Sequence, residues 1–384
     1  MNCLINLYNQ TAAGPKNISL NLISELMSQS SDSCSFYIIV PDIQEYTALC
    51  STSNVHVIKL QKVNSVLRKI VVRIYLDVIL IPKLVKKYQI TAMLAFGNFL
   101  LSPVNVKKVV LLHHPYLFDN ALLQKLPLFS KLIEKIKRFT FWVTLKNVDV
   151  LVVQSPYVLE EVKKVWTNYK SELTVIPNPI SKDFITQSVL EINGLITQRA
   201  LSLDDKLTIL YVSRFYPHKN HAFLLALSSE LTNANIKHQI LVTVDPEISG
   251  ADVFLNDVAS KGLPILNLGE IKQIDLVEFY KTSHFFLFPS KSETFGNPLI
   301  EAMSYGLPVI VPSLQYAHSV VGESGIYYEE DNAKECAIRM LGLIQNVSQY
   351  TAKSLHSHQS FARYPNATDW CKRYLDILRS NKNL

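Results

Sequence analysis

The feature that most constrains this chain is an alternation of short apolar runs with helical stretches, which begins near residue 4 and begins again near residue 207. Short apolar runs bounded by turn residues are typical of strands that are buried on both faces of a parallel sheet. The helical stretches between them supply the crossover connections that parallel pairing needs. We therefore predict an α/β fold with two doubly wound, Rossmann-like parallel-sheet domains.

The predicted elements divide into two series. Strands of the first series are predicted at residues 4–8, 36–40, 55–60, 92–96, 109–113, 150–153 and 173–176. Strands of the second series are predicted at residues 207–212, 239–244, 265–268, 285–288, 308–311 and 326–328. Helices are predicted at residues 17–27, 63–87, 156–166, 222–231, 275–282, 298–305 and 333–344.

A polar, irregular stretch around residues 181–205 separates the two series. We therefore expect a first domain at residues 1–183, a linker at 184–205 and a second domain at 206–365. In parallel sheets of this kind, ligands bind beyond the carboxyl ends of the strands. Two facing sheets would place those ends on opposite walls of one cleft.

The composition fits a chain that can bury two large cores. Of its 384 residues, 48% are hydrophobic and 18% are charged, unlike a disordered segment. The five cysteines are scattered without zinc-ligand spacing, so we expect buried thiols in a reducing compartment and no metal site. We expect no secretory leader, and no apolar run reaches the roughly 18 residues of a membrane span. A cytoplasmic protein, soluble or bound to a surface, is therefore expected.

Positive charge is concentrated in the first half of the chain. Residues 1–183 hold 21 basic and 12 acidic residues, a net charge of +9, whereas residues 184–384 hold 17 and 20, a net charge of −3. Part of the excess lies on a predicted helix at residues 122–148, which also carries Phe129, Phe139 and Trp142. Such a helix can rest on an anionic membrane, or it can be a solvated face opposite a buried one. No nucleic-acid-binding module is recognisable, so no nucleic acid partner is expected.

Residues 285–311, with the sequence FFLFPSKSETFGNPLIEAMSYGLPVIV, carry the strongest chemical signals. They predict a buried strand ended by Pro289, a polar loop, and a helix with Asn297 as its N-cap and Pro298 as its first residue. Gly306 is a suitable end for that helix. The free N–H groups and partial positive charge of its N-terminus suit a phosphate.

Two carboxylates flank this helix N-terminus, Glu293 in the loop and Glu301 one turn into the helix. Because a carboxylate only accepts hydrogen bonds, either residue could bind neighbouring hydroxyls of a ribose or hexose. The alternative is that Glu301 only balances the helix dipole and that Glu293 is solvated. The two residues alone leave both interpretations open.

Two cations follow the predicted strand at residues 207–212. Arg214 comes directly after it, and Lys219 comes five residues later at the start of the next helix. A guanidinium fork and a compact ammonium group together suit a diphosphate. An ordinary surface pair of cations is the alternative.

Two further segments lie at predicted strand ends of the first domain. His113 ends the strand at residues 109–113 and His114 follows it, at a place where a neutral imidazole could donate to a sugar hydroxyl or transfer a proton. A histidine beside an apolar face is often structural, so both roles stay open. Gly14, in the first strand–helix turn, either lets backbone approach a ligand or only serves the turn.

Taken together, these motifs resemble those of the retaining glycosyltransferases of family 4, which have the GT-B architecture. The family signature of two glutamates separated by seven residues corresponds to Glu293 and Glu301, and its upstream Arg–Lys pair corresponds to Arg214 and Lys219. The resemblance covers nearly the whole chain and is strongest over residues 207–311. Residues 366–384 resemble the family's last helix, which crosses back onto the first domain.

The resemblance implies a role for each candidate residue. Arg214 and Lys219 would neutralise the donor diphosphate in place of a metal, so no cofactor is implied. Glu301 would hold the nucleotide ribose, and Glu293 would bind the donor sugar. His113, rather than His114, would lie beside the donor sugar and the acceptor. Further donor contacts are implied for Gly14, Gly269, Ile271, Phe295, Gly296 and Asn297.

We therefore expect a metal-independent hexosyltransferase that moves a sugar from a UDP- or GDP-sugar to a glycan or lipid-linked acceptor, with retained anomeric configuration. The pathway would be surface polysaccharide or lipopolysaccharide biosynthesis, at the cytoplasmic face of a membrane. The basic first domain would bind the acceptor and the second domain the nucleotide sugar. The alternatives are a nucleotide-sugar epimerase on the same scaffold and a non-catalytic partner subunit at the membrane.

Overall fold

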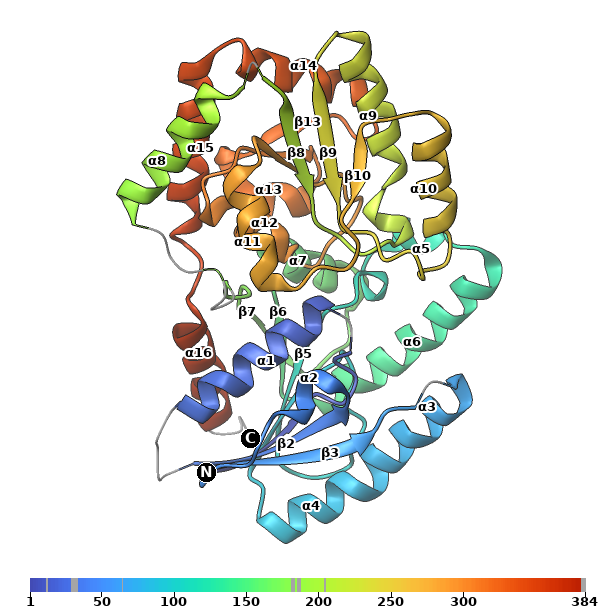
Figure 1. The fold of residues 1–384 in the computed structure, drawn as a ribbon. Coiled ribbons are helices and arrows are strands. Elements are labelled where there is room, and N and C mark those ends of the chain that lie inside the picture. Colours follow the sequence, from blue (N-terminus) through green and yellow to red (C-terminus); the bar gives the residue numbers. More distant parts are fainter. Residues whose placement is uncertain are drawn as a thin grey trace. The chain divides into compact units, whose positions relative to one another are not determined.

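The computed structural model describes residues 1–11, 13–28, 34–63, 65–180, 184, 188–203 and 205–380. The chain forms two compact units, one of Met1–Ser181 with Pro365–Leu384 and one of Lys182–Tyr364. Each unit contains one parallel β-sheet (Figure 1). The prediction of two Rossmann-like parallel-sheet domains is therefore confirmed.

The sheet of the first unit has seven strands in the order β3-β2-β1-β4-β5-β6-β7 among the described residues. The strands are β1 (Asn2–Asn6), β2 (Ser35–Asp42), β3 (Val55–Gln61), β4 (Ala92–Phe96), β5 (Lys107–Leu111), β6 (Val150–Val153) and β7 (Glu172–Val175). β5 begins two residues earlier than predicted, with two buried lysines. Their ammonium groups find acceptors, since Lys108 Nζ donates to the Ser102 carbonyl at 2.9 Å and Lys107 Nζ to the Ser380 carbonyl at 2.8 Å.

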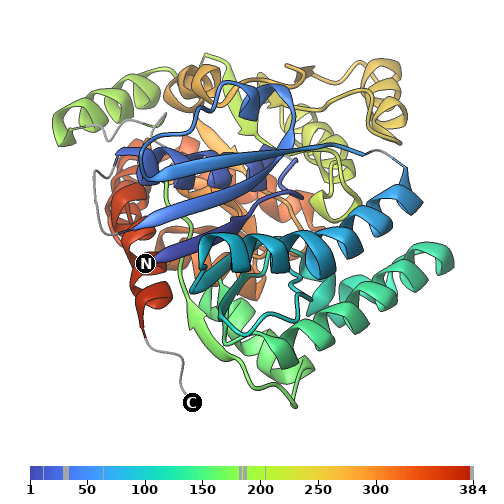
Figure 2. The same ribbon diagram turned by 90° about the horizontal axis from the view of Figure 1, so that it is seen from below.

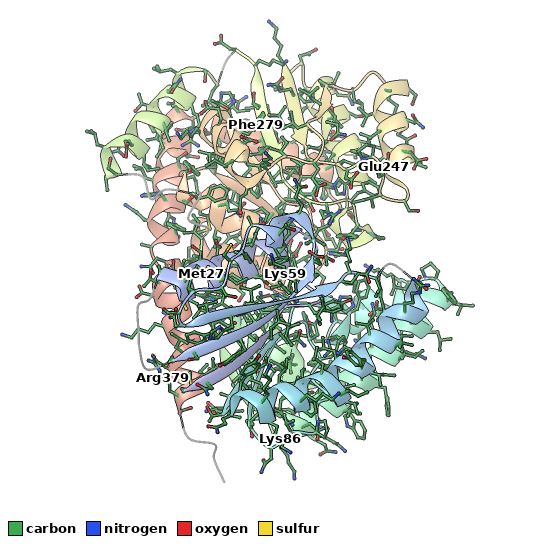
Figure 3. The ribbon with its side chains drawn as sticks, turned by 60° about the horizontal axis from the view of Figure 1, so that its bottom comes forward. Met27, Lys59, Lys86, Glu247, Phe279 and Arg379 are labelled. Carbon is green, nitrogen blue, oxygen red and sulfur yellow. The ribbon has the colours of Figure 1, made fainter. Side chains whose placement is uncertain are left out.

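Helices cover both faces of this first sheet. They are α1 (Ala13–Ser28), α2 (Gln44–Thr47), α3 (Val66–Ile74), the π-helical turn η1 (Tyr75–Leu80), α4 (Ile81–Tyr88), the 3₁₀ turn η2 (Pro115–Leu117), α5 (Asn120–Gln124), α6 (Leu128–Asn147), α7 (Pro156–Val165) and α16 (Ala367–Arg379). α3, η1 and α4 form one continuous rod that runs beside α6 (Figures 1 and 2). Lys86, near the end of α4, points away from the sheet (Figure 3).

Each face of the first sheet has its own apolar core. α1 and α16 cover one face, where Leu22, Trp370 and Tyr374 pack. The rod α3–η1–α4, α6 and α7 cover the other face, where Leu84 and Phe141 are buried. The last helix of the chain therefore belongs to the first unit, because its apolar side completes a core that begins at β1.

The second unit has six parallel strands in the order β10-β9-β8-β11-β12-β13 among the described residues. The strands are β8 (Leu207–Tyr211), β9 (His238–Val242), β10 (Ile265–Asn267), β11 (Phe285–Leu287), β12 (Val309–Pro312) and β13 (Ile326–Tyr328). The helices are α8 (Val189–Leu201), η3 (Pro217–Lys219), α9 (Ala222–Asn233), α10 (Ala251–Ser260), α11 (Gln273–Thr282), α12 (Asn297–Ser304), α13 (Gln315–Val321), η4 (Gly322–Ser324), α14 (Ala333–Ile344) and α15 (Val347–Phe361). Every predicted strand of both series is present, with ends shifted by at most a few residues.

Three expectations about local structure were wrong. The stretch expected to be an irregular linker contains α8, which starts at a Ser188–Glu191 capping box and buries Ile192 and Ile196; the predicted boundary at residues 181–183 lies outside the described residues. The single helix predicted at residues 122–148 is two helices, because Pro127 precedes α6. Cys50 is exposed, whereas the other four cysteines are buried as expected, and none of the five forms a disulfide.

No described helix combines the length and apolarity needed to cross a bilayer.

Candidate functional site

Charged residues and a glycine of the second unit follow four strands that lie side by side. Arg214 follows β8, Asp245 follows β9, Gly269 follows β10 and Glu293 follows β11, and these four strands are consecutive in the sheet. Because these strands are parallel, the loops after them all leave from the carboxyl ends of the strands, which we call the carboxyl edge of the sheet. This arrangement gathers the charged side chains that the sequence spaces over about 80 residues.

Lys219 and Glu293 form an ion pair at this edge. Lys219 Nζ donates to Glu293 Oε1, and the side chains are only 16% and 10% exposed. Ser290 donates to the same carboxylate oxygen at 2.6 Å. The ammonium group also lies 5.2 Å from the centre of the Phe288 ring. A buried charge pair that is this well satisfied is an ordered site, not a solvated surface pair.

The loop that carries Glu293 is tied to the loop after β8. The backbone N–H of Lys291 donates to the His218 carbonyl at 2.7 Å, and Tyr316 donates to the Ser290 carbonyl at 2.5 Å. On the other side, Tyr211 donates to the Lys219 carbonyl at 2.6 Å. One backbone hydrogen bond and two tyrosine hydroxyls that donate to backbone carbonyls therefore fix the segments that carry the ion pair.

Glu301 is buried on α12 and is held by two residues of α11. Tyr280 donates to Glu301 Oε2 at 2.8 Å and Gln273 donates to Oε1 at 3.0 Å. Burial raises the pKa of Glu301 to about 7, despite the opposing effect of these two hydrogen bonds. The same burial, with the neighbouring carboxylate, raises the pKa of Tyr280 well above its usual range. Each carboxylate oxygen can accept a second hydrogen bond, so Glu301 can still bind hydroxyl groups.

The helix α12 begins one residue earlier than predicted. Its N-cap is Gly296, with φ of +86°, and Asn297 is its first residue, so the prediction of Asn297 as N-cap was wrong. The left-handed conformation explains the glycine: a Cβ atom there would lie 3.0 Å from Leu299 Cδ1 and 3.3 Å from Phe288 Cε1. Phe295 beside it is buried, with its ring 5.5 Å from that of Tyr364.

Arg214 does not join the Lys219–Glu293 pair. Its Nη2 atom lies 3.7 Å from Asp245 Oδ2, a separation too long for a hydrogen bond. Gly269 has φ of +73°, with its N–H donating to Asn267 Oδ1 at 3.1 Å, and Ile271 is half-buried in the same loop. These three residues lie on the β8–β10 side of the edge.

In the first unit, His113 is half-buried with its Nε2 atom enclosed, and its imidazole is neutral at pH 7. Its Nδ1 atom lies 3.2 Å from Gln154 Nε2, and its backbone N–H donates to Asn98 Oδ1 at 2.6 Å. Burial lowers its pKa to about 4. Because the Gln154 amide nitrogen donates, Nδ1 accepts and the ring proton lies on Nε2, which is buried without a hydrogen-bond partner among the described residues.

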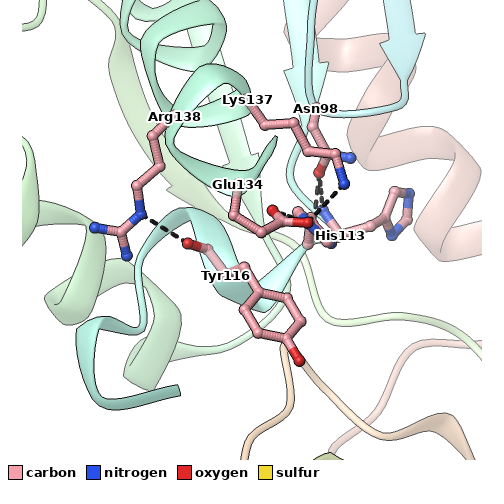
Figure 4. Close-up of polar contacts among 7 residues, drawn as sticks. Asn98, His113, Tyr116, Glu134, Lys137 and Arg138 are labelled. Atoms are coloured by element: carbon pink, nitrogen blue, oxygen red, sulfur yellow. Dashed lines mark hydrogen bonds and ion pairs between the residues drawn. The ribbon is translucent and has the colours of Figure 1, made fainter. Parts of the chain in front are cut away.

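His114 has a different partner, the buried carboxylate of Glu134 on α6. His114 Nε2 lies 2.7 Å from Glu134 Oε2, and Lys137 Nζ lies 2.7 Å from Glu134 Oε1 (Figure 4). Burial would raise the pKa of Glu134, but the hydrogen bonds from His114 and Lys137 hold it below its usual value. Nearby, Arg138 Nε donates to the Tyr116 carbonyl at 2.8 Å (Figure 4). α6 therefore holds the segment that follows the two histidines.

Gly14 is exposed in the first turn of α1, where a Cβ atom would meet nothing within 4 Å. The structure gives no steric reason for glycine there, and its role in donor binding remains a prediction. Among the described residues, no group of three or more His, Cys, Asp and Glu side chains is placed to hold a metal ion.

Several residues of these clusters were not identified from the sequence as site residues. Gln273 and Tyr280 were not among the candidate residues. They are seven residues apart on α11 and so share one face of the helix, and this spacing is visible in the sequence. Asp245, Gln154 and Glu134 became apparent only from their contacts, because each meets its partner through tertiary structure.

Comparison with known proteins identifies the second unit. The model of the family described as glycosyl transferases group 1 matches residues 206–346. These residues form a glycosyl transferase group 1 domain. This confirms the family resemblance inferred from the motifs, and the group 1 domain contains every candidate residue of the second unit.

Among curated proteins, the chain is 25% identical over 240 residues to the O-antigen chain mannosyltransferase RfbU of Salmonella typhimurium, over 59% of each chain. The matched segment thus spans little more than half of that relative. Among solved structures, sucrose-phosphate synthase from Thermosynechococcus elongatus has a TM-score of 0.76 at 17% identity and covers 99% of this chain and 98% of its own. WaaG has a TM-score of 0.73 at 12% identity, over 99% of this chain and 100% of its own. These likenesses confirm the GT-B fold that the resemblance implied.

Proposed function

We propose that this chain is a retaining glycosyltransferase that moves a hexose from a UDP- or GDP-sugar to a glycan or lipid-linked acceptor. The observation that carries the proposal is the buried Lys219–Glu293 pair at the carboxyl edge of the group 1 domain's sheet. The similarity to a mannosyltransferase of O-antigen chains supports a surface polysaccharide or lipopolysaccharide product, with mannose the first sugar to test. The same similarity favours a sugar transferase over a nucleotide-sugar epimerase or a non-catalytic subunit.

The donor would bind in the second unit at the carboxyl edge of its sheet. Lys219 is neutralised by Glu293 in the free protein, and a diphosphate would offer it a stronger, doubly charged partner. Arg214, which makes no hydrogen bond to Asp245 at 3.7 Å, keeps guanidinium donors for the same diphosphate. Glu301 would accept from the ribose hydroxyls, and Glu293, released from Lys219, from the donor sugar.

The remaining donor contacts would come from backbone and loop residues. The N–H groups of Phe295, Gly296 and Asn297, at the start of α12, would contact the sugar or phosphate. Gly269 and Ile271 would line the nucleobase, and Gly14 would let the α1 turn approach the donor. The first unit would bind the acceptor.

Catalysis in this proposal is mainly electrostatic. As the glycosidic bond breaks, negative charge grows on the leaving diphosphate, and Arg214, Lys219 and the N-terminus of α12 stabilise it. The sugar becomes oxocarbenium-like. His113 is uncharged at neutral pH, since its pKa is about 4. It can therefore donate from Nε2 to a sugar hydroxyl without opposing that positive charge.

The two cations would take the charge-neutralising role that a divalent metal has in other transferases. We therefore expect transfer to continue after the protein is dialysed against a chelator. Loss of activity that returns on adding Mg²⁺ or Mn²⁺ would contradict this part of the proposal.

A thermal-shift screen of nucleotide sugars, followed by a transfer assay with the donor found, tests the proposed function. A ligand that binds only the folded state raises the melting temperature, so we expect one UDP- or GDP-sugar to do so in the wild type and to do so less in Glu301→Ala. A purified chain that responds to no nucleotide sugar would contradict the proposal.

We also propose that the reaction takes place at the cytoplasmic face of a membrane.

A further inference from the structure

The first unit exposes an apolar surface that the proposed donor site does not use. Among the described residues, 12 of the 21 exposed large apolar side chains lie on two segments, α3–η1 and α6. Six lie on α3–η1: Ile70, Val71, Ile74, Tyr75, Val78 and Ile79. Six lie on α6: Leu128, Phe129, Leu132, Ile133, Ile136 and Phe139. We call these twelve residues the apolar surface.

The spacing of these residues makes one stripe on each helix. On α6, positions 129, 132, 133 and 136 recur every three or four residues, and on α3–η1, positions 70, 71, 74, 75 and 78 do the same. The exposed fractions are large, at 76% for Phe129 and 57% for Ile74. Ordinary surfaces carry scattered apolar side chains, whereas contiguous patches mark interaction sites.

The two stripes face the same way. The rod α3–η1–α4 and α6 cover the same face of the first sheet, with Leu76 and Phe141 buried in one core. They also hold one loop between them, because Arg73 donates to the Phe99 carbonyl and the Leu100 N–H donates to Thr144 Oγ1 at 3.3 Å. Both views show the helices running side by side (Figures 1 and 2). Their outer sides therefore lie on the same side of the first unit.

The charges around this surface have one sign. Residues 66–88 and 128–147 contain 11 basic residues and two acidic ones, Asp77 and Glu134. Both acids are buried and paired, Asp77 with Arg73 at 2.7 Å and Glu134 with Lys137 and His114. Lys86, Lys135 and Lys146 are exposed. Every exposed charge on these segments is thus positive.

We propose that the apolar surface docks on an anionic lipid bilayer, with its apolar stripes in the headgroup–acyl boundary and the surrounding lysines on anionic headgroups. A basic helix face with exposed Phe and Leu side chains has the composition of an interfacial helix. Trp142, under the Lys146 ammonium at 3.6 Å from its ring centre, is a residue type favoured at that depth. A second copy of the chain is a poorer occupant, because a two-fold contact would oppose two positively charged faces.

Vesicle flotation of the full-length chain tests the docking surface. The probes are phosphatidylcholine vesicles with and without phosphatidylglycerol, at low and high salt. We expect binding only to the anionic vesicles, weakened by salt. Phe129→Asp and Ile74→Asp should each lower the partition coefficient about tenfold or more. Lys135→Gln and Lys146→Gln should each lower it about fivefold.

Leu190→Asp is the matched control, because Leu190 is 81% exposed on α8 of the second unit and should not change binding. Far-UV circular dichroism confirms that each variant is folded. The proposal fails if wild type binds neither vesicle, if binding ignores lipid charge, or if the variants bind as well as the control. A lipid-free dimer abolished by Phe129→Asp would assign the surface to a second copy instead. Nucleotide binding is measured without lipid, so the result is independent of the proposed function.

Discussion

At the scale of single residues, Glu301 shows how burial changes the chemistry of a carboxylate. Two hydrogen bonds, from Tyr280 and Gln273, do not offset the cost of removing the charge from water. The folded protein therefore holds a proton at Glu301 at pH values where the unfolded chain has lost it. This difference links folding stability to pH.

The first prediction concerns that link. Because the pKa of Glu301 is raised, the folded state binds a proton that the unfolded chain has lost. The stabilising contribution of this bound proton is complete below pH 4.5 and is lost as the pH rises through about 7. The loss should approach about 3 kcal/mol at alkaline pH. Glu301→Gln, which resembles the protonated acid, should remove this dependence. Urea unfolding from pH 4 to pH 9 measures it, and parallel curves for both proteins would contradict the pKa shift.

The second prediction concerns Lys219. If its cation stabilises the leaving diphosphate, Lys219→Ala should lower turnover at saturating donor by about 10²-fold or more. Lys291→Ala is the control, because Lys291 lies in the loop that carries Glu293 but pairs with Asp331 at 2.5 Å. Its turnover should stay near that of the wild type. Equal turnover in folded Lys219→Ala and Lys291→Ala would remove Lys219 from the proposed mechanism.

At the scale of elements, the start of α12 depends on one glycine. Gly296→Ala should destabilise the second unit by about 1–2 kcal/mol, since an L-residue is strained at φ of +86° and its Cβ atom would contact Leu299. Gly342→Ala, in the open interior of α14, should instead be neutral or stabilising by up to about 1 kcal/mol. Thermal unfolding of the two variants compares them directly. A stable Gly296→Ala with unchanged donor binding would disprove this account of the N-cap.

The elements also show which features a sequence can predict. Buried parallel strands are short apolar runs, so β4 and β6 were predicted to the residue. The N-cap of α12 was misplaced because Asn297 and Gly296 are both good candidates locally, and the φ angle decides between them. The ion pair of Lys219 and Glu293 joins residues 74 positions apart. Each of the two residues could be predicted from its residue type and motif. The contact between them depends on the adjacency of β8 and β11, which the sequence does not state.

At the scale of the whole molecule, the last helix stabilises the unit that the chain begins with. Trp370 is fully buried against Phe96 and Tyr374. Trp370→Ala should cost about 3–5 kcal/mol of unfolding free energy. Hydrogen exchange should show the loss in β1, β4 and α1, with β8 to β13 little changed. Leu190→Ala, at an exposed position, should change neither region, and uniform loss of protection in Trp370→Ala would contradict the assignment of α16 to the first unit.

The two sides of α6 have different partners. Its outer side is apolar and basic, while its inner side supplies Glu134 to His114 and Arg138 to the Tyr116 carbonyl. These two hydrogen bonds join α6 to residues 114 and 116, which directly follow His113. We therefore expect a reorientation of α6 to shift the segment that carries the imidazole proposed to face the sugar.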